Sequence, residues 1–145
     1  MAPAGRMISK TPEIAVLDTS VYVENVRSGR FRERLLTLPF LVRVSAVVVA
    51  ELTRGARSRQ AKRFVQHLSR NFTLVVPTDR DWVRSGEIVR VLADKHDYEI
   101  NKIREIHFDA LIALTTRRLG AYLVTCNAGD FMAIRDVVGF KLTCW

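Results

Sequence analysis

Short apolar runs alternate with helical patterns along the chain. Runs rich in β-branched residues are typical of buried strands, and they predict strands at 14–18, 40–44, 72–76 and 121–125, with a short fifth strand at 139–143. Apolar residues at helical spacing predict helices at 19–26, 31–38, 45–54, 58–70, 78–96, 108–119 and 131–137. The polar segment 97–105 is expected to form a loop or a frayed turn. Strands that alternate with helices predict an α/β fold, here a three-layer α/β/α sandwich around a mostly parallel sheet of four or five strands.

The length of 145 residues suits one domain with a core of its own. We assign this domain to residues 14–145 and expect a flexible N-terminal leader at 1–13. No apolar stretch approaches the ~20 residues that cross a bilayer, and the N-terminal residues lack the apolar segment of a signal peptide. The two cysteines, Cys126 and Cys144, make no disulfide framework, which indicates a reducing, cytoplasmic location.

The formal net charge of +8 is concentrated in one part of the chain. Residues 27–70, called the basic window below, contain eleven arginines and lysines but only two acids, Glu33 and Glu51. Arginine side chains match phosphate oxygens, so the basic window favours a polyanion such as a nucleic acid as partner. A solvated surface without a ligand explains the same charge equally well.

Four carboxylates lie beside predicted core elements, where an uncompensated charge costs several kcal/mol. Asp18 ends the first strand, and Glu51 lies about two turns into the helix after the second strand. Asp109 opens an apolar helix, and Asp130 follows the fourth strand. Because ligands of open α/β sheets bind at the carboxyl ends of the strands, we expect the four acids to converge in one crevice.

Clustered carboxylates raise one another's pKa, and a divalent cation removes that conflict. Ligands that are all oxygen favour Mg²⁺ or Mn²⁺ over zinc. Such an ion activates a water molecule and neutralises charge on a phosphodiester. Acids that hold a metal, beside a basic surface that holds a nucleic-acid backbone, together indicate a nuclease.

Each acid also has an ordinary structural explanation. Asp18 could cap the helix that follows it, and Asp109 in a first helical turn would complement the helix dipole. Asp130, three residues after Asn127, could belong to a turn. Glu51 is the hardest to explain in this way, because the apolar helix around it offers little polar face.

The ordered set of these motifs resembles the PIN-domain family, and specifically its VapC-like toxins. The matching segments are Leu17-Asp18-Thr19-Ser20-Val21, Ser45 through Glu51-Leu52, Asp109-Ala110-Leu111-Ile112-Ala113, and Thr125-Cys126-Asn127-Ala128-Gly129-Asp130-Phe131. The resemblance covers nearly the whole chain from about Ile14 onward. It implies a small α/β/α sandwich that hydrolyses RNA with a metal-activated water, leaving a 5′-phosphate and a 3′-hydroxyl.

The resemblance also implies roles for particular residues. The principal Mg²⁺ ligands would be Asp18 and Asp109, with Glu51 and Asp130 completing the metal shell directly or through water. Polar helpers that orient carboxylates or waters would be Ser20, Thr125 and Asn127. For Ser20 and Thr125, local capping of the backbone is at least as good an explanation.

Partners follow from the same resemblance. VapC-like toxins pair with a small antitoxin whose tail fills the groove near the acids, and they tend to form homodimers. The amphipathic segments 31–38 and 61–68 could form a hydrophobic clamp for an antitoxin helix, or they could simply pack in the core. His107 is expected to serve in packing, and the C-terminal segment 140–145 departs from the common family ending. The alternative function is a PIN-like module that binds RNA or a protein without cutting.

Overall fold

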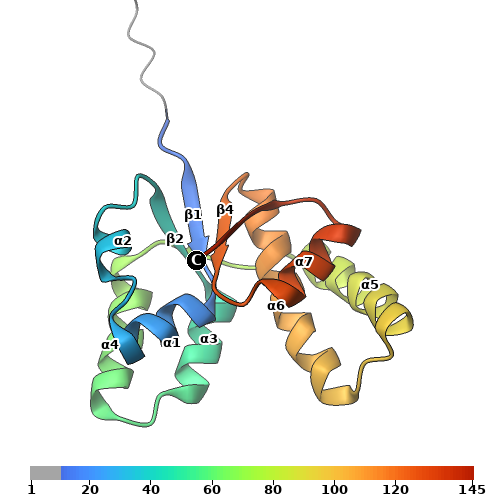
Figure 1. Ribbon diagram of the computed structural model, residues 1–145, viewed down its shortest axis with the longest axis horizontal. Helices are drawn as coiled ribbons and strands as arrows, with labels where there is room; N and C mark the ends of the chain where they lie inside the picture. Colours follow the sequence, from blue (N-terminus) through green and yellow to red (C-terminus); the bar gives the residue numbers. More distant parts are fainter. Residues whose placement is uncertain (1–10) are drawn as a thin grey trace, which may run out of the picture.

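The computed structural model describes residues 11–145 (Figure 1). Its helices and strands are, in chain order, β1 (Ile14–Leu17), α1 (Thr19–Ser28), α2 (Arg32–Leu36), β2 (Leu41–Ser45), α3 (Ala46–Gly55), α4 (Arg59–Asn71), β3 (Leu74–Val75), α5 (Asp79–His96), α6 (Ile100–Arg118), β4 (Tyr122–Thr125), α7 (Ala128–Val137) and β5 (Lys141–Cys144).

The strands of the described part form one parallel sheet in the order β3-β2-β1-β4-β5. The chain builds outward from β1 through β2 and β3, then returns to the other side of β1 with β4 and β5. The winding therefore reverses between β1 and β4, and a crevice opens at the carboxyl ends of strands at such a switch point. In Figure 1, α1 to α4 gather on one side of the strands and α5 to α7 on the other. The predicted α/β fold is confirmed.

The core is built around β1, β4 and α6. Ala15 and Val16 of β1 and Leu123 of β4 are fully buried, and so are residues 110–113 of α6. Burying one leucine or isoleucine side chain stabilises a fold by about 1.5–3 kcal/mol. The apolar run in α6 therefore fixes this helix against the sheet and holds the preceding residue, Asp109, at a defined place.

The loop predicted at 97–105 is wrong for most of that segment. α5 ends at His96, and Asp97 closes it in a left-handed conformation (φ 54°) with its N–H bonded to Ala93 O. α6 already begins at Ile100. The physical reason is that Ile103 and Ile106 continue the apolar stripe of α6, and Ile106 is fully buried. Asp109 consequently lies in the middle of α6, so the helix-dipole explanation for this residue is wrong as well.

Other boundaries shift by a few residues. The helix predicted at 31–38 is the short α2, which ends at Leu36 ahead of Pro39. The strand predicted at 72–76 contains only the two residues of β3, which pair with β2 at one edge of the sheet. The leader predicted at 1–13 falls largely on residues 1–10, which lie outside the described part. Within residues 11–145, no helix is both long enough and apolar enough to cross a membrane.

Candidate active site

Asp18 is fixed at the switch point by two hydroxyl groups. It follows β1, caps the N-terminus of α1, and is only 5% exposed. Its Oδ2 accepts hydrogen bonds from Ser20 Oγ at 2.6 Å, Thr125 Oγ1 at 3.0 Å and Ser20 N at 3.3 Å. Thr125 reaches Asp18 because β4 pairs with β1, with Leu17 opposite Val124. Since these bonds all use Oδ2, and no residue in 11–145 donates to Oδ1, this second oxygen is available to a cation.

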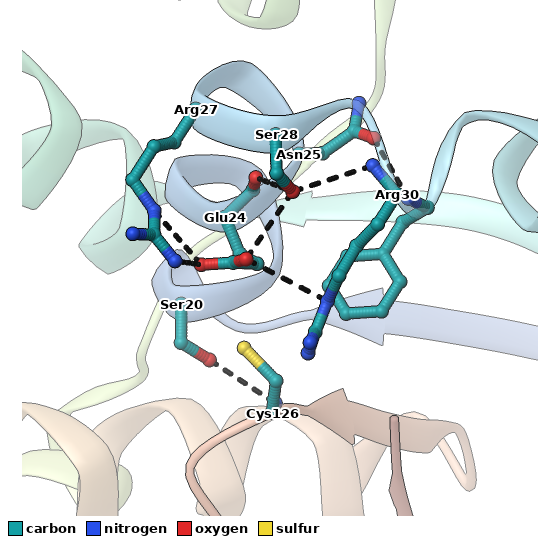
Figure 2. A network of polar contacts seen from close by, with 8 residues as sticks. Ser20, Glu24, Asn25, Arg27, Ser28, Arg30 and Cys126 are labelled. Atoms are coloured by element: carbon teal, nitrogen blue, oxygen red, sulfur yellow. Dashed lines mark hydrogen bonds and ion pairs between the residues drawn. The ribbon is translucent and has the colours of Figure 1, made fainter.

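The two hydroxyl groups also cap local backbone. Ser20 Oγ accepts from Cys126 N at 3.2 Å, a contact drawn in Figure 2, and Thr125 Oγ1 accepts from Asn127 N at 3.0 Å. Each hydroxyl therefore combines the capping role with orientation of the Asp18 carboxylate. The Asn127 side chain is exposed, and this residue enters the network through its backbone N–H.

Glu51 lies on α3, close to Asp18. Its Oε1 accepts a hydrogen bond from Thr19 Oγ1 at 3.0 Å, and Thr19 directly follows Asp18. Burial raises the pKa of Glu51, and the negative charge of Asp18 raises it further, although the Thr19 hydrogen bond and the Arg54 charge act in the opposite direction. The sequence analysis did not single out Thr19, whose hydroxyl ties α1 to α3.

Asp109 faces the other three acids from the middle of α6. Burial, followed by the charges of Asp18, Glu51 and Asp130, raises the pKa of Asp109 from 3.8 to about 8. No residue in 11–145 donates a hydrogen bond to its carboxylate or forms a salt bridge with it. Asp18, Glu51 and Asp130 thus all act electrostatically on Asp109, and among residues 11–145 only the weaker effect of the Lys102 charge lowers the pKa of Asp109.

Asp130 differs from the other acids because it already has a cationic partner. It lies in the first turn of α7, and Lys102 Nζ contacts both of its carboxylate oxygens at 2.6 Å. This hydrogen bond raises the pKa of Lys102. Lys102 was not predicted as a site residue because it falls in the segment predicted as a loop. On α6, its seven-residue spacing from Asp109 places both side chains on the same helical face.

The chemistry of the donor set fits a hard divalent cation, since every candidate ligand is a carboxylate. Asp18 Oδ1, Glu51 and Asp109 carry the charge that such an ion would neutralise. The positions of these side chains do not yet form a complete metal site. No three His, Cys, Asp or Glu side chains among residues 11–145 are arranged to hold a metal ion together. Carboxylate rotation would therefore have to accompany ion binding, and Asp130 would have to share its oxygens with Lys102.

Two hollows adjoin Glu51, one on each side of α3. The first, called the Trp82 pocket, has a volume of about 410 Å³ and lies between α3, α6 and the start of α5. The second, called the α1–α4 groove, has a volume of about 530 Å³ and lies between α1, α3 and α4. Arg54 lines the pocket and Arg27 lines the groove, so arginines of the basic window line the hollows on both sides of Glu51.

Part of the basic window is neutralised within the fold. Figure 2 shows Glu24 of α1 between two arginines, with Arg27 at 2.7 Å and Arg30 at 3.6 Å. The hydrogen bond from Arg27 lowers the pKa of Glu24. Arg54, by contrast, makes no salt bridge with any residue in 11–145. It is therefore the better placed of these arginines to meet an external anion near the acids.

The remaining sequence hypotheses have mixed outcomes. Ala61, Phe64 and Val65 of α4 line the α1–α4 groove as the clamp hypothesis requires, but the opposite wall is α1 rather than the segment 31–38. His107 packs as expected, with its ring against Trp82 and its Nε2 at 2.8 Å from a serine hydroxyl.

The C-terminal residue, Trp145, is anchored to the sheet and to a neighbouring aromatic ring. Its N–H donates to Thr125 O at 2.8 Å, and its indole contacts Phe31 with 5.3 Å between ring centroids. Trp145 therefore continues the backbone pairing of β5 with β4 beyond Cys144, and its ring packs against the residue that precedes α2.

Known proteins give a consistent picture of the fold. The PIN domain family model matches residues 15–136. VapBC-1 from nontypeable Haemophilus influenzae is a similar solved structure, with a TM-score of 0.66 and 23% identity over 91% of this chain and 98% of that chain. DNA-bound VapBC from Salmonella typhimurium is another, with a TM-score of 0.69 and 21% identity over 92% of this chain and 98% of that chain. FitAcB from Neisseria gonorrhoeae is also similar, with a TM-score of 0.64 and 24% identity over 88% of this chain and 95% of that chain. A search of curated proteins found no match. Because the family model spans most of the chain, this protein belongs to the PIN-domain family.

Proposed function

We propose that this protein is a Mg²⁺- or Mn²⁺-dependent endoribonuclease and the toxin of a toxin–antitoxin pair. The observation that carries the proposal is Asp109, a half-buried carboxylate whose pKa is raised to about 8 by burial and by three neighbouring acids. Its charge is compensated by no hydrogen bond or salt bridge from residues 11–145. A bound divalent cation would stabilise the ionised form of this acid, which the charge of Lys102 compensates only in part.

The proposed residue roles follow from the observed contacts. Asp18 would hold the ion through Oδ1, because Ser20 and Thr125 immobilise Oδ2. Asp109 would be the second principal ligand, and Glu51 and Asp130 would complete the shell directly or through water. A bound divalent ion activates water and neutralises charge on the phosphodiester. In the hydrolysis, the water oxygen bonds to phosphorus and the 3′-oxygen leaves, which yields a 5′-phosphate and a 3′-hydroxyl.

The RNA backbone is proposed to lie across the face that carries Glu51, between the two hollows. Arg54 on one side and Arg27 on the other are placed to meet phosphates, although Arg27 is shared with Glu24. Single-stranded RNA suits this surface better than a duplex, because splayed bases can enter the hollows that flank the acids.

The proposed partners are a small antitoxin and a second copy of the chain. The solved structures with the same fold include VapBC toxin–antitoxin complexes. In this protein, the α1–α4 groove is mainly apolar and has Glu51 in its lining, which suits an amphipathic antitoxin segment that also reaches this acid. Val23 and Val26 of α1 line it and are 52% and 65% exposed.

We place the protein in the cytoplasm on the basis of its free cysteines, Cys126 and Cys144.

One observation favours the alternative, a PIN-like module that binds RNA or protein without cutting. Lys102 already neutralises Asp130 at 2.6 Å, and no three candidate ligands in 11–145 form a ready metal cage. If Lys102 permanently replaces a cation at this place, the acids would serve in binding only.

The test compares RNA cleavage by the pure protein in Mg²⁺, Mn²⁺ and chelator. We expect metal-dependent cleavage that falls by at least about 100-fold in Asp18→Asn and in Asp109→Asn, because each variant removes a proposed ligand charge. Asp81→Asn is the matched control, since Asp81 is a buried acid that pairs with Arg118 and caps α5.

The outcomes separate the possibilities. Equal cleavage by the wild type and both ligand variants would reveal a contaminating nuclease. Tight RNA binding without cleavage in either metal would establish the binding module.

A further inference from the structure

The Trp82 pocket is lined mainly by apolar and aromatic side chains, which the binding of a metal ion by the proposed acids does not require. Its walls come from α3, from Val76 and Pro77 between β3 and α5, and from Phe108 of α6. Its volume of about 410 Å³ falls within the ~300–1,000 Å³ typical of ligand pockets. Trp82 is 51% exposed and Val76 is 60% exposed. Large apolar side chains are thus held open to solvent around a hollow, an arrangement typical of binding sites.

The charged side chains of the pocket connect it to the acids. Glu51, which accepts the Thr19 hydrogen bond next to Asp18, also lines the pocket. Arg54, three residues later on α3, lines it too. A ligand with a flat apolar face and a nearby negative charge would match both features, because the aromatic rings would cover its face and Arg54 would meet its charge. An unpaired nucleotide has this chemistry, with a base that stacks and a phosphate that binds arginine.

The indole of Trp82 is held in place rather than free. His107 meets it edge to face, with 6.0 Å between ring centroids and an interplanar angle of 72°. Ser85 Oγ donates to Trp82 O at 2.7 Å, so its lone pair accepts from His107 Nε2 at 2.8 Å. A ring fixed in this way loses little conformational freedom when a base stacks on it.

One stretch of α6 couples the pocket to the metal site. His107 supports the indole, Phe108 lines the pocket, and Asp109 faces the acids. These three consecutive residues belong to a helix whose next residues are fully buried. The distance between a base in the pocket and a phosphate at the acids is therefore fixed by rigid secondary structure.

We propose that the Trp82 pocket binds one unpaired nucleobase of the RNA, next to the phosphate that is cut. Trp82 stacks on the base, Phe108 completes the apolar wall, and Arg54 contacts the adjoining backbone phosphate. This inference rests on the proposed ribonuclease function and adds a determinant of substrate choice to it. A second copy of the chain could cover the same apolar residues, but the charged rim of Glu51 and Arg54 is better matched by a nucleotide than by an apolar dimer interface.

The direct test uses Trp82 as its own reporter. Trp145→Phe leaves Trp82 as the single tryptophan, since the chain has two. Titrating this protein in EDTA with a short single-stranded RNA should quench Trp82 fluorescence. The titration is repeated with RNAs that carry an abasic residue at each position in turn. At one position, the abasic RNA should bind with less quenching of Trp82 fluorescence than the intact RNA. Binding is followed independently by the anisotropy of labelled RNA. The proposal is overturned if RNA binds without changing the fluorescence of Trp82. It is also overturned if no RNA binds in either of two conditions, namely the wild-type site in EDTA and the Asp18→Asn variant in Mg²⁺.

The kinetic test uses substitutions of exposed residues. Trp82→Ala should lower kcat/KM for RNA by about 10- to 100-fold, mainly through KM, whereas Trp82→Phe should stay within about threefold of wild type. Val83→Ala is the matched control, because Val83 is 68% exposed on the same helix and does not line the pocket. Each variant is also examined by size-exclusion chromatography with light scattering, and a changed oligomeric state in Trp82→Ala overturns the proposal in favour of a dimer interface.

The failure of this inference can be told apart from failure of the proposed function. Metal-dependent cleavage with equal kcat/KM in wild type and Trp82→Ala rejects the nucleobase pocket and leaves the ribonuclease intact. Quenching by RNA that is lost at the abasic position, without cleavage in any metal, supports the pocket and rejects the ribonuclease.

Discussion

Asp81 and Asp109 show that a buried or half-buried aspartate can have its charge balanced within the fold or left largely unbalanced. Asp81 is 7% exposed, yet it accepts from Thr78 N at 2.9 Å and pairs with Arg118 at 3.3 Å. Its charge is balanced inside the fold. Asp109 has no hydrogen bond or salt bridge of this kind among residues 11–145, and the charges of three other acids outweigh that of Lys102 on it. Burial alone does not distinguish the two residues, whereas the identity of their neighbours does.

The raised pKa of Asp109 predicts how stability depends on pH. Between the ordinary value of 3.8 and the folded value of about 8, the folded protein keeps a proton that the unfolded chain has lost. The free energy of unfolding should therefore fall as pH rises through this window. Glu51 contributes in the same direction, and Glu24, with its lowered pKa, contributes in the opposite direction only near its ordinary value of 4.5.

Asp109→Asn removes this pH dependence because asparagine cannot ionise. Each pH unit between the two pKa values is worth about 1.4 kcal/mol. The stability advantage of the variant over the metal-free wild type should therefore grow between pH 5 and pH 8, by at most about 4 kcal/mol. Urea denaturation at the two pH values in EDTA provides the measurement. A stability difference that is the same at pH 5 and pH 8 would contradict the assignment of the raised pKa to Asp109.

At the scale of elements, the sequence predicts most helices and strands because their periodicity is local. β1, β4 and α3 appear within one or two residues of their predicted positions. The failure at 97–105 has a physical cause. The start of α6 projects from the molecule, so Asn101, Arg104 and Glu105 are exposed and dilute the apolar signal of Ile103 and Ile106. The stripe consists of three isoleucines, Ile100, Ile103 and Ile106, among polar residues. So short a stripe resembles a loop when tertiary packing is not known.

Because residues 97–105 were predicted as a loop, Lys102 of the candidate site was not predicted. The acids could be predicted because strand ends and apolar helices mark their places in the sequence. Lys102 could not, because its contact with Asp130 joins α6 to the first turn of α7 across 28 residues. Thr19 was missed for a similar reason, since its bond to Glu51 depends on how α1 meets α3. Side-chain pairs between distant elements need the fold before they can be assigned.

The early start of α6 leads to a prediction about stability. Ile106→Ala should destabilise the protein by about 2–4 kcal/mol, because it removes a fully buried side chain and leaves a cavity. Ile100→Ala is the matched control, since Ile100 is 68% exposed in the first turn of the same helix and should change stability by less than about 0.5 kcal/mol. Chemical denaturation followed by circular dichroism measures both. Equal, small effects would mean that residues 100–106 do not pack as a helix against the core.

At the scale of the whole molecule, positive and negative charges concentrate in different regions. The net charge of +8 lies mostly in the basic window, while the acids of the candidate site lie at the carboxyl edge of the sheet, with Glu51 belonging to both regions. Some arginines of the window are already paired, as Arg27 and Arg30 are with Glu24. The choice between an RNA surface and a solvated face therefore depends on unpaired arginines close to the acids, and Arg54 is the clearest of these.

The salt dependence of RNA binding tests this division directly. Each phosphate neutralised on a single strand contributes about 0.7 to the slope of log K against log salt concentration, because a condensed counterion is released. If Arg54 contacts a phosphate, Arg54→Gln should weaken RNA binding at low salt and reduce the slope by about 0.7. Arg90→Gln is the matched control, since Arg90 is exposed on α5 outside the basic window and should change neither quantity. Fluorescence anisotropy in EDTA over a series of salt concentrations measures both. If the two variants show identical slopes, Arg54 contacts no phosphate and belongs to a solvated face.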